Sequence, residues 1–241
     1  MDRKIEILPD KAALIERSRQ LMLDKIHGAI ADRDRCTLAL AGGGTPKPLY
    51  EALANETLPL DKIHIFWSDE RYVPPDHSDS NQLMARQAWL DRVNFPEANI
   101  HPMPTQSGDP EADARLHEHQ LHQFFQTSPG EFPSFDFILL GIGDDGHTAS
   151  LFPHTDALTV RDRLVTVGNK DGQPRITFTI PFINSARCVA FVVAGAGKQA
   201  ALSRILAESG DNATYPARHI QPQGELWWVL DQSVGAAIAS Q

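Results

Sequence analysis

The sequence predicts an α/β fold in which helices cover both faces of a mainly parallel sheet. Short apolar runs that suit buried strands alternate with stretches that carry apolar residues at helical spacing. Glycine-bearing loops follow three of these runs, after Leu40, Leu140 and Val193. Ligands of such sheets bind beyond the carboxyl ends of the strands. We therefore expect the functional site in the loops at that edge.

Bulk composition bounds the kind of protein. The chain has 241 residues and no linker-like tract, which predicts one domain over residues 1–241. Its hydrophobic fraction of 41% and charged fraction of 22% are ordinary globular values and argue against disorder. The net charge of −9 argues against a general surface for nucleic acid or acidic membranes, because such surfaces need excess Lys and Arg.

The sequence also bears on the cellular setting. No apolar stretch approaches the ~20 residues that span a bilayer, and the first residues lack the apolar segment of a signal peptide. Cys36 and Cys188 each start an apolar run, so we interpret them as small core residues rather than as a disulfide. We expect a cytoplasmic protein with no membrane or nucleic-acid partner, present as a monomer or a weak homo-oligomer.

The first elements surround a glycine-rich loop. Residues 4–8 suit an edge strand, and Asp10 suits the N-cap of a long amphipathic helix. The run LALAGGGTPKPLYEAL then predicts a strand, a loop with Gly43 and Gly44, and a helix capped by Thr45. Free N–H groups and the helix dipole make such a loop a natural phosphate site. Lys47 replaces the third glycine of a dinucleotide fingerprint, and the run does not match a Walker loop.

A second strand, residues 63–67, runs directly into Asp69, Glu70 and Arg71. Charged residues in this place lie at the carboxyl end of the strand and could bind a ligand. Capping of the following segment is the alternative, and the residues alone leave both open. The next helix starts at Asp79 or Ser80.

A polar helix is predicted at residues 111–125, and it carries His117, His119 and His122. A metal site is disfavoured there, because His117 and His119 point to different faces of a helix and no suitable zinc-ligand set accompanies them. We interpret these histidines as a solvated face and predict no metal.

The most informative stretch is FDFILLGIGDDGHTASLFP, from Phe135 to Pro153. An apolar strand at residues 137–140 stops at a loop whose three glycines accompany Asp144, Asp145 and His147. Histidine titrates near neutral pH and aspartate can orient it, so the loop suits acid–base chemistry. A turn with solvated aspartates and one surface histidine is the alternative reading of this loop taken alone.

The rest of the chain supplies four more strands. Residues 163–167 and 175–180 suit two short strands separated by a turn at 168–174, and Pro181 ends the second. The run RCVAFVVAGAGKQAAL predicts a buried strand, a glycine loop that fails the Walker pattern, and a helix starting near Lys198. The last strand is residues 225–230, and Asp231 caps a short helix.

Four loops therefore leave the carboxyl ends of predicted strands and should line one rim. Together they offer a phosphate cradle, an arginine, a lysine and an Asp/His pair. A small phosphorylated substrate fits this set better than a nucleotide.

Several of these segments together resemble one enzyme family. LALAGGGTPKPLYEAL, FWSDERYVPPDHSDSN, GIGDDGHTASLFP and the PARHIQ and ELWWVLD runs are similar, in order, to the 6-phosphogluconolactonase family. The resemblance implies a Rossmann-like, sugar-phosphate isomerase-like fold that hydrolyses 6-phosphoglucono-δ-lactone without a nucleotide, other cofactor or required metal. Related deaminases carry a glutamate five residues after the histidine, where this chain has Phe152.

The resemblance suggests roles for the rim residues. His147, oriented by Asp145, would activate water, and Arg71 would either stabilise the oxyanion or grip the phosphate. Gly43, Gly44, Thr45 and Lys198 are the expected phosphate ligands, and Arg187 is a weaker candidate. Asp69 and Asn81 would orient substrate or water.

Two other functions compete with lactone hydrolysis. One is a sugar-phosphate isomerase or deaminase of the same fold. Phe152 argues against it, because the carboxylate tied to sugar-ring opening is missing at that position. A non-catalytic sugar-phosphate sensor would need a DNA-binding segment, for which the short stretch before Cys36 leaves little room.

Overall fold

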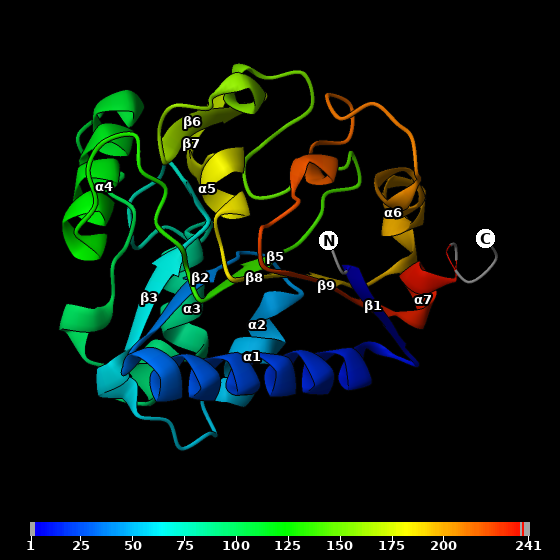
Figure 1. Cartoon of the computed structure of the whole chain (residues 1–241), viewed down its shortest axis with the longest axis horizontal. Coiled ribbons are helices and arrows are strands. Elements are labelled where there is room, and N and C mark those ends of the chain that lie inside the picture. Colours follow the sequence, from blue (N-terminus) through cyan, green and yellow to red (C-terminus); the bar gives the residue numbers. More distant parts are fainter. Residues whose placement is uncertain (1–2, 237, 239–241) are drawn as a thin grey trace.

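The computed structural model describes residues 3–236 and residue 238 and contains a six-stranded parallel sheet. The strand order is β1-β9-β8-β5-β2-β3, and each neighbouring pair is parallel (Figure 1). This arrangement confirms the predicted fold class. The strands are β1 (Arg3–Leu8), β2 (Cys36–Leu40), β3 (Ile63–Trp67), β5 (Phe137–Leu140), β8 (Cys188–Val193) and β9 (Glu225–Asp231).

Helices cover both faces of the sheet, because its strands are apolar on both sides. The helices are α1 (Lys11–Arg33), α2 (Pro46–Leu53), α3 (Asn81–Ala88), α4 (Pro110–Phe125), α5 (Ile180–Asn184), α6 (Gln199–Leu206) and α7 (Gln232–Gly235). Helices α4, α5 and α6 lie on one face of the sheet and α1, α2 and α3 on the other (Figure 1). In β8, Val189 and Phe191 pack toward the first face, and Cys188 and Ala190 toward the second. The 3₁₀ turns are η1 (Leu60–Lys62), η2 (Leu90–Arg92), η3 (Glu97–Asn99), η4 (Asp156–Thr159), η5 (Ala196–Lys198) and η6 (Pro216–His219). Among the described helices none is both long and apolar enough to cross a membrane.

Three of the predicted helix caps are confirmed. The side chains of Asp10, Ser80 and Asp231 accept hydrogen bonds from backbone N–H groups in the first turns of α1, α3 and α7. The predicted cap of α2 is wrong, because Thr45 has helical angles (φ −82°, ψ −45°) and its side chain makes no capping bond. The Thr45 hydroxyl is therefore not used by the helix.

A second, antiparallel sheet stands beside the first, in the order β4-β7-β6. Its strands are β4 (Asp69–Arg71), β6 (Val165–Lys170) and β7 (Gln173–Phe178). The predicted turn at residues 168–174 is too long, because Asp171 and Gly172 (φ 53° and 82°) alone form a tight hairpin turn. Residues 180 and 181 begin α5 behind the cap Thr179 instead of ending a strand.

Of the three α4 histidines, His119 is exposed as predicted, but His117 and His122 do not lie on a solvated face. His117 is 1% exposed and His122 is 8% exposed. The His117 ring lies parallel to Phe178 of β7, with 6.3 Å between centroids. The helix packs on the small antiparallel sheet through this side, so the prediction of solvent exposure is wrong for both residues.

The order of the large sheet defines its switch point. From β2 the chain moves outward to β3, whereas β5, β8 and β9 extend the sheet in the other direction. The loops after β2 and β5 therefore leave neighbouring strands at the place where the strand order reverses. Crevices at such points are the usual ligand sites of open α/β sheets.

Candidate active site

A cavity of about 270 Å³ lies at this switch point. It lies between the glycine loop, residues 42–45, and the His147 loop, residues 141–147, and is closed on a third side by β4 and β7. A neighbouring cavity of about 410 Å³ continues along the glycine loop toward the start of α1. The polar side chains lining the first are Ser68, Asp69, Arg71, Asn81, His147, Arg175 and Lys198, and those lining the second are Lys11, Thr45 and Lys198.

His147 and Asp145 form a close pair in the His147 loop. Nδ1 of His147 lies 2.5 Å from Oδ1 of Asp145, and the same oxygen accepts the His147 backbone N–H at 3.1 Å. A neutral imidazole in this arrangement carries its proton on Nδ1, next to the carboxylate. Nε2 is then the basic nitrogen of a ring that lines the cavity.

The loop is tight because Gly143 lies directly behind this pair. Its N–H donates to the His147 carbonyl at 2.8 Å, and its carbonyl accepts the Gly146 N–H at 3.1 Å. A Cβ at position 143 would lie 2.0 Å from His147 Nδ1 and 2.4 Å from Asp145 Oδ1. Only glycine therefore fits between the loop backbone and the two side chains.

Electrostatics keep His147 neutral near pH 7. Burial lowers the pKa of the imidazole below its ordinary value, although Asp145 and then Asp69 act in the opposite direction. Burial raises the pKa of Asp145, but hydrogen bonds from His147 and the field of its imidazole outweigh it and lower that pKa overall. A neutral base beside an ionised carboxylate is the arrangement that proton abstraction from water requires.

Two arginines face each other on the small antiparallel sheet. Arg71 of β4 is the register partner of Arg175 of β7, and both side chains line the cavity. Burial and the neighbouring charge of Arg71 lower the pKa of Arg175. Arg71 donates from Nη1 to the Asp79 carbonyl at 2.9 Å, and its buried Nε has no acceptor among the described residues. The two guanidinium groups give the cavity positive charge on this side.

The buried carboxylate of Glu70 holds β4 against the start of α3. It accepts the backbone N–H groups of Arg71, Asn81 and Gln82, each at 2.8 Å. Burial raises the pKa of Glu70 despite these bonds. The Asn81 side chain in turn donates to the Asp69 carbonyl at 2.9 Å. Glu70 thus fixes the segments that carry Asp69, Arg71 and Asn81.

Lys198 joins two of the loops. Its Nζ lies 2.6 Å from Oδ1 of Asp144, which belongs to the His147 loop. Lys198 ends η5, and it lines both cavities. An incoming anion would find this ammonium at the junction of the two spaces.

The backbone is strained at the floor of the first cavity. Ala149 has φ 47°, in the left-handed region that costs a residue with a Cβ of order 1 kcal/mol. It follows the His147 loop closely and lines the cavity. Such strain concentrates at functional sites because the surrounding structure imposes it.

The structure brings most of the predicted site residues together. Gly43, Asp69, Arg71, Asn81, His147 and Lys198 line the first cavity, Gly44 and Thr45 line the second, and Asp145 stands behind His147. Arg187 does not join them. It precedes β8, so it lies at the amino end of the sheet, where its Nε is 3.5 Å from Asp136 Oδ1.

Sequence reasoning missed two cations of the site. Arg175 falls in a predicted strand and Lys11 in the helix predicted after Asp10, and neither is predicted to belong to the site. A signal existed for Lys11, which directly follows the N-cap Asp10 at the carboxyl end of β1. Among the described residues no group of three or more His, Cys, Asp or Glu side chains is arranged to hold a metal ion.

Comparison with known proteins identifies the family. A model described as glucosamine-6-phosphate isomerases/6-phosphogluconolactonase matches residues 9–228. The chain belongs to this family. The 6-phosphogluconolactonase of Synechocystis sp. is 64% identical over 235 residues, which cover 98% of each chain. That of Nostoc sp. is 61% identical over 239 residues, covering 99% of this chain and 100% of the relative.

Solved structures of the family share the fold. The 6-phosphogluconolactonase from Trypanosoma cruzi superposes with a TM-score of 0.87 at 29% identity, covering 98% of this chain and 96% of the other. The family resemblance predicted from the sequence segments is thereby confirmed over 98% of the chain. Because the family also includes glucosamine-6-phosphate isomerases, the choice between activities rests on the site.

Proposed function

We propose that this chain hydrolyses 6-phosphoglucono-δ-lactone to 6-phosphogluconate, the second step of the oxidative pentose phosphate pathway. Relatives at 64% and 61% identity over nearly the whole chain carry the name 6-phosphogluconolactonase. The observation that carries the proposal within the family is the environment of His147. Its ring packs against Phe152, with 4.5 Å between centroids, where the related deaminases have a carboxylate. An apolar side chain there leaves no acid for the ring opening of an amino sugar.

The reaction needs one base, and His147 is suited to that role. Nε2 takes a proton from water as the water oxygen attacks the lactone carbonyl. The resulting imidazolium, paired with Asp145, then returns a proton to the ring oxygen as the C–O bond breaks. Water is thus added across the ester bond, and the histidine ends neutral. Such acid–base help contributes about 10²–10⁴-fold.

The cations divide between the two ends of the substrate. The glycine loop and Lys198 bind the phosphate, because the second cavity combines an ammonium with backbone N–H groups near the start of α2. Arg71 and Arg175 provide positive charge beside His147, for the oxyanion or for a phosphate oxygen. Kinetics of Arg71→Gln separate these roles, because loss of an oxyanion contact lowers kcat whereas loss of a ground-state contact raises KM. Asp69 and Asn81 orient the substrate or the water.

The test is the decay of freshly generated 6-phosphoglucono-δ-lactone with wild type, His147→Ala, His27→Ala and buffer alone. His27 is an exposed histidine of α1 and serves as the matched control. We expect acceleration by wild type and His27→Ala and its loss in His147→Ala. Decay at the buffer rate with folded wild type would refute the activity, and release of ammonia from glucosamine 6-phosphate would favour the deaminase.

The proposal extends to the domain organisation, the compartment and the oligomeric state of the protein. We propose one domain over residues 1–241, because both core clusters share the strands of one sheet. We also propose that it works in the cytoplasm as a monomer or a weak homo-oligomer, without nucleic acid or a cofactor. Light scattering during size-exclusion chromatography tests the oligomeric state.

A further inference from the structure

The His147 loop is held from behind by a segment that sequence reasoning left without a role, the PARHIQ run. The Ala217 N–H of η6 donates to the Gly146 carbonyl at 3.1 Å. Tyr215 lies so close that a Cβ at Gly146 would be 2.7 Å from its Cδ1. Gly146 also has φ 81°, which only glycine adopts readily. The position of the His147 loop therefore depends on the position of η6.

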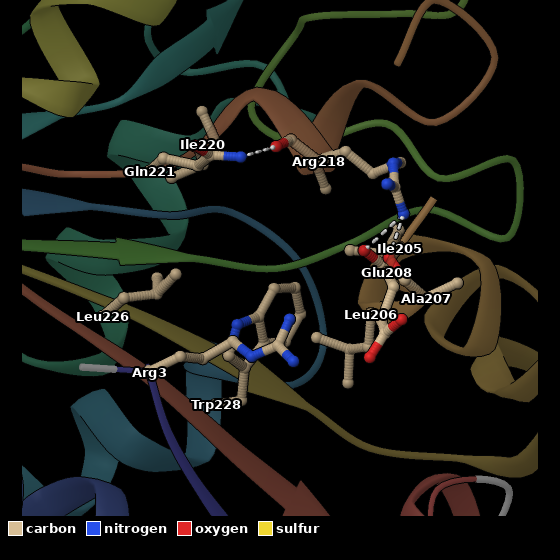
Figure 2. A pocket seen from close by; sticks show the side chains of 11 residues that line it. Arg3, Ile205, Leu206, Ala207, Glu208, Arg218, Ile220, Gln221, Leu226 and Trp228 are labelled. Atoms are coloured by element: carbon tan, nitrogen blue, oxygen red, sulfur yellow. Dashed lines mark hydrogen bonds between the residues drawn. The ribbon is translucent and has the colours of Figure 1, made fainter. Parts of the chain in front are cut away.

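Arg218 fastens η6 to the carboxyl end of α6. Its Nη1 donates to the carbonyls of Arg204, Ile205 and Ala207 at 2.6, 3.0 and 2.9 Å, and Figure 2 shows this guanidinium directed at the helix end. Its Nε donates to Oδ1 of Asn212 at 2.9 Å. The last carbonyls of a helix have no partner within the helix, so one cation here satisfies several of them and complements the helix dipole.

Packing against the large sheet supports this region only in part. An open cavity of about 580 Å³ lies between the α6–η6 segment and strands β1 and β9 (Figure 2). Arg3 and Trp228 on the strand side and Leu206 and Ile220 on the other side are among the residues that line it. Apolar contacts with the core hold the buried side of α6 and η6, and the hydrogen bonds of Arg218 join the two elements beside the cavity.

These contacts form a closed circuit on one side of the candidate active site. The circuit begins at Lys198 and follows α6 to its carboxyl end, where Arg218 binds the last carbonyls. From Arg218 it continues through η6 to Gly146 in the His147 loop. Asp144 of that loop returns to Lys198 through their ion pair. We propose that Arg218 is a positioning residue that sets the distance between Lys198 and His147. This inference rests on the proposed function for its kinetic consequence, but not for its structural one.

Replacement of Arg218 should increase the mobility of the His147 loop while the protein as a whole stays folded. Because a misplacement of about 1 Å can reduce a rate ~10²-fold, we expect Arg218→Ala to lower kcat/KM for the lactone by at least about tenfold, mainly in kcat. Amide hydrogen exchange should become several-fold faster in residues 141–147 and stay unchanged in α3. Arg218→Lys keeps the charge but not the forked set of N–H donors. Its kcat/KM and its exchange rates in residues 141–147 should lie between those of wild type and Arg218→Ala.

Arg204→Ala is the matched control. Arg204 is an exposed arginine of α6, and its carbonyl, which accepts a hydrogen bond from Arg218, is retained in the variant. We expect its rate and its exchange to equal those of wild type. A folded Arg218→Ala with unchanged exchange in residues 141–147 would overturn the inference, whether or not its activity falls. Should Arg218→Ala fail to fold, Arg218→Lys decides by the same criterion.

The exchange measurement also separates the two proposals. If wild type does not hydrolyse the lactone, the proposed function fails, while faster exchange in the variant still supports the positioning role. If wild type is active and the variant keeps both its rate and its exchange, only the positioning role fails.

Discussion

A single methyl group at Gly143 should disable the site without removing any of its functional groups. In Gly143→Ala the new Cβ would lie 2.0 Å from Nδ1 of His147 and 2.4 Å from Oδ1 of Asp145. Carbon and nitrogen atoms that are not bonded do not approach closer than about 3 Å, so the two side chains must move. The His147–Asp145 pair, at 2.5 Å, is the contact that must give way.

The size of the effect follows from that displacement. Restoring an ordinary contact requires the imidazole to shift by about 1 Å, and shifts of this size cost ~10²-fold in rate. That factor corresponds to about 2.7 kcal/mol of activation free energy. The loss should fall on kcat rather than KM, because the residues assigned to the phosphate lie on other loops.

Gly28→Ala is the matched control for the assay. A Cβ at position 28 would meet no atom within 4 Å, and this exposed glycine of α1 lines neither cavity of the site. Both variants are compared with wild type for kcat and KM in lactone hydrolysis, after thermal unfolding has established that each is folded. A kcat for Gly143→Ala within threefold of that for Gly28→Ala would refute the placement of the Asp145–His147 pair.

Three further predictions concern the surroundings of the base and the stability of the fold. Asp145→Asn removes a charge that raises the pKa of His147, so the acid limb of the kcat/KM profile should move to lower pH and kcat should fall about 10–10²-fold; an unmoved limb would contradict this. Arg175→Gln should raise KM about tenfold if the guanidinium grips the phosphate, and lower kcat instead if it stabilises the oxyanion; unchanged constants would exclude it from the site. Burial, and then the charge of neighbouring His64, lowers the pKa of His101 to about 4, so the unfolded chain binds the extra proton first. The free energy of unfolding, measured with urea, should therefore fall as pH decreases from about 6.5 to 4, and His101→Phe should reduce that slope.

The elements that the sequence predicted well are those specified locally. The run FILLGIG ends a strand because apolar residues stop at glycines, and Asp10 and Ser80 begin helices because their side chains reach their own first turns. The gathering of the site loops at one edge of the sheet was also predictable, because all the parallel strands have their carboxyl ends at that edge. The same rule could have excluded Arg187, which stands before its strand and not after it.

The features that were missed depend on contacts between distant segments. The pairing of Arg71 with Arg175 joins residues more than a hundred positions apart, through a sheet that no local pattern announces. His117 is polar and lies on a helix with few apolar residues, yet β7 covers it. Thr45 is a residue type that often caps helices, but its backbone angles are helical because the glycine loop leads directly into α2.

The pairing of Arg71 with Arg175 has a consequence for the energetics of catalysis. Like charges directly opposite each other on neighbouring strands repel, so the β4–β7 ladder brings them together at a cost to the folded state. That work is done once, when the chain folds, and no reorganisation is needed when an anion arrives. The protein is in this sense preorganised: the stability lost through repulsion between the two cations reappears as stabilisation of negative charge that develops during the reaction.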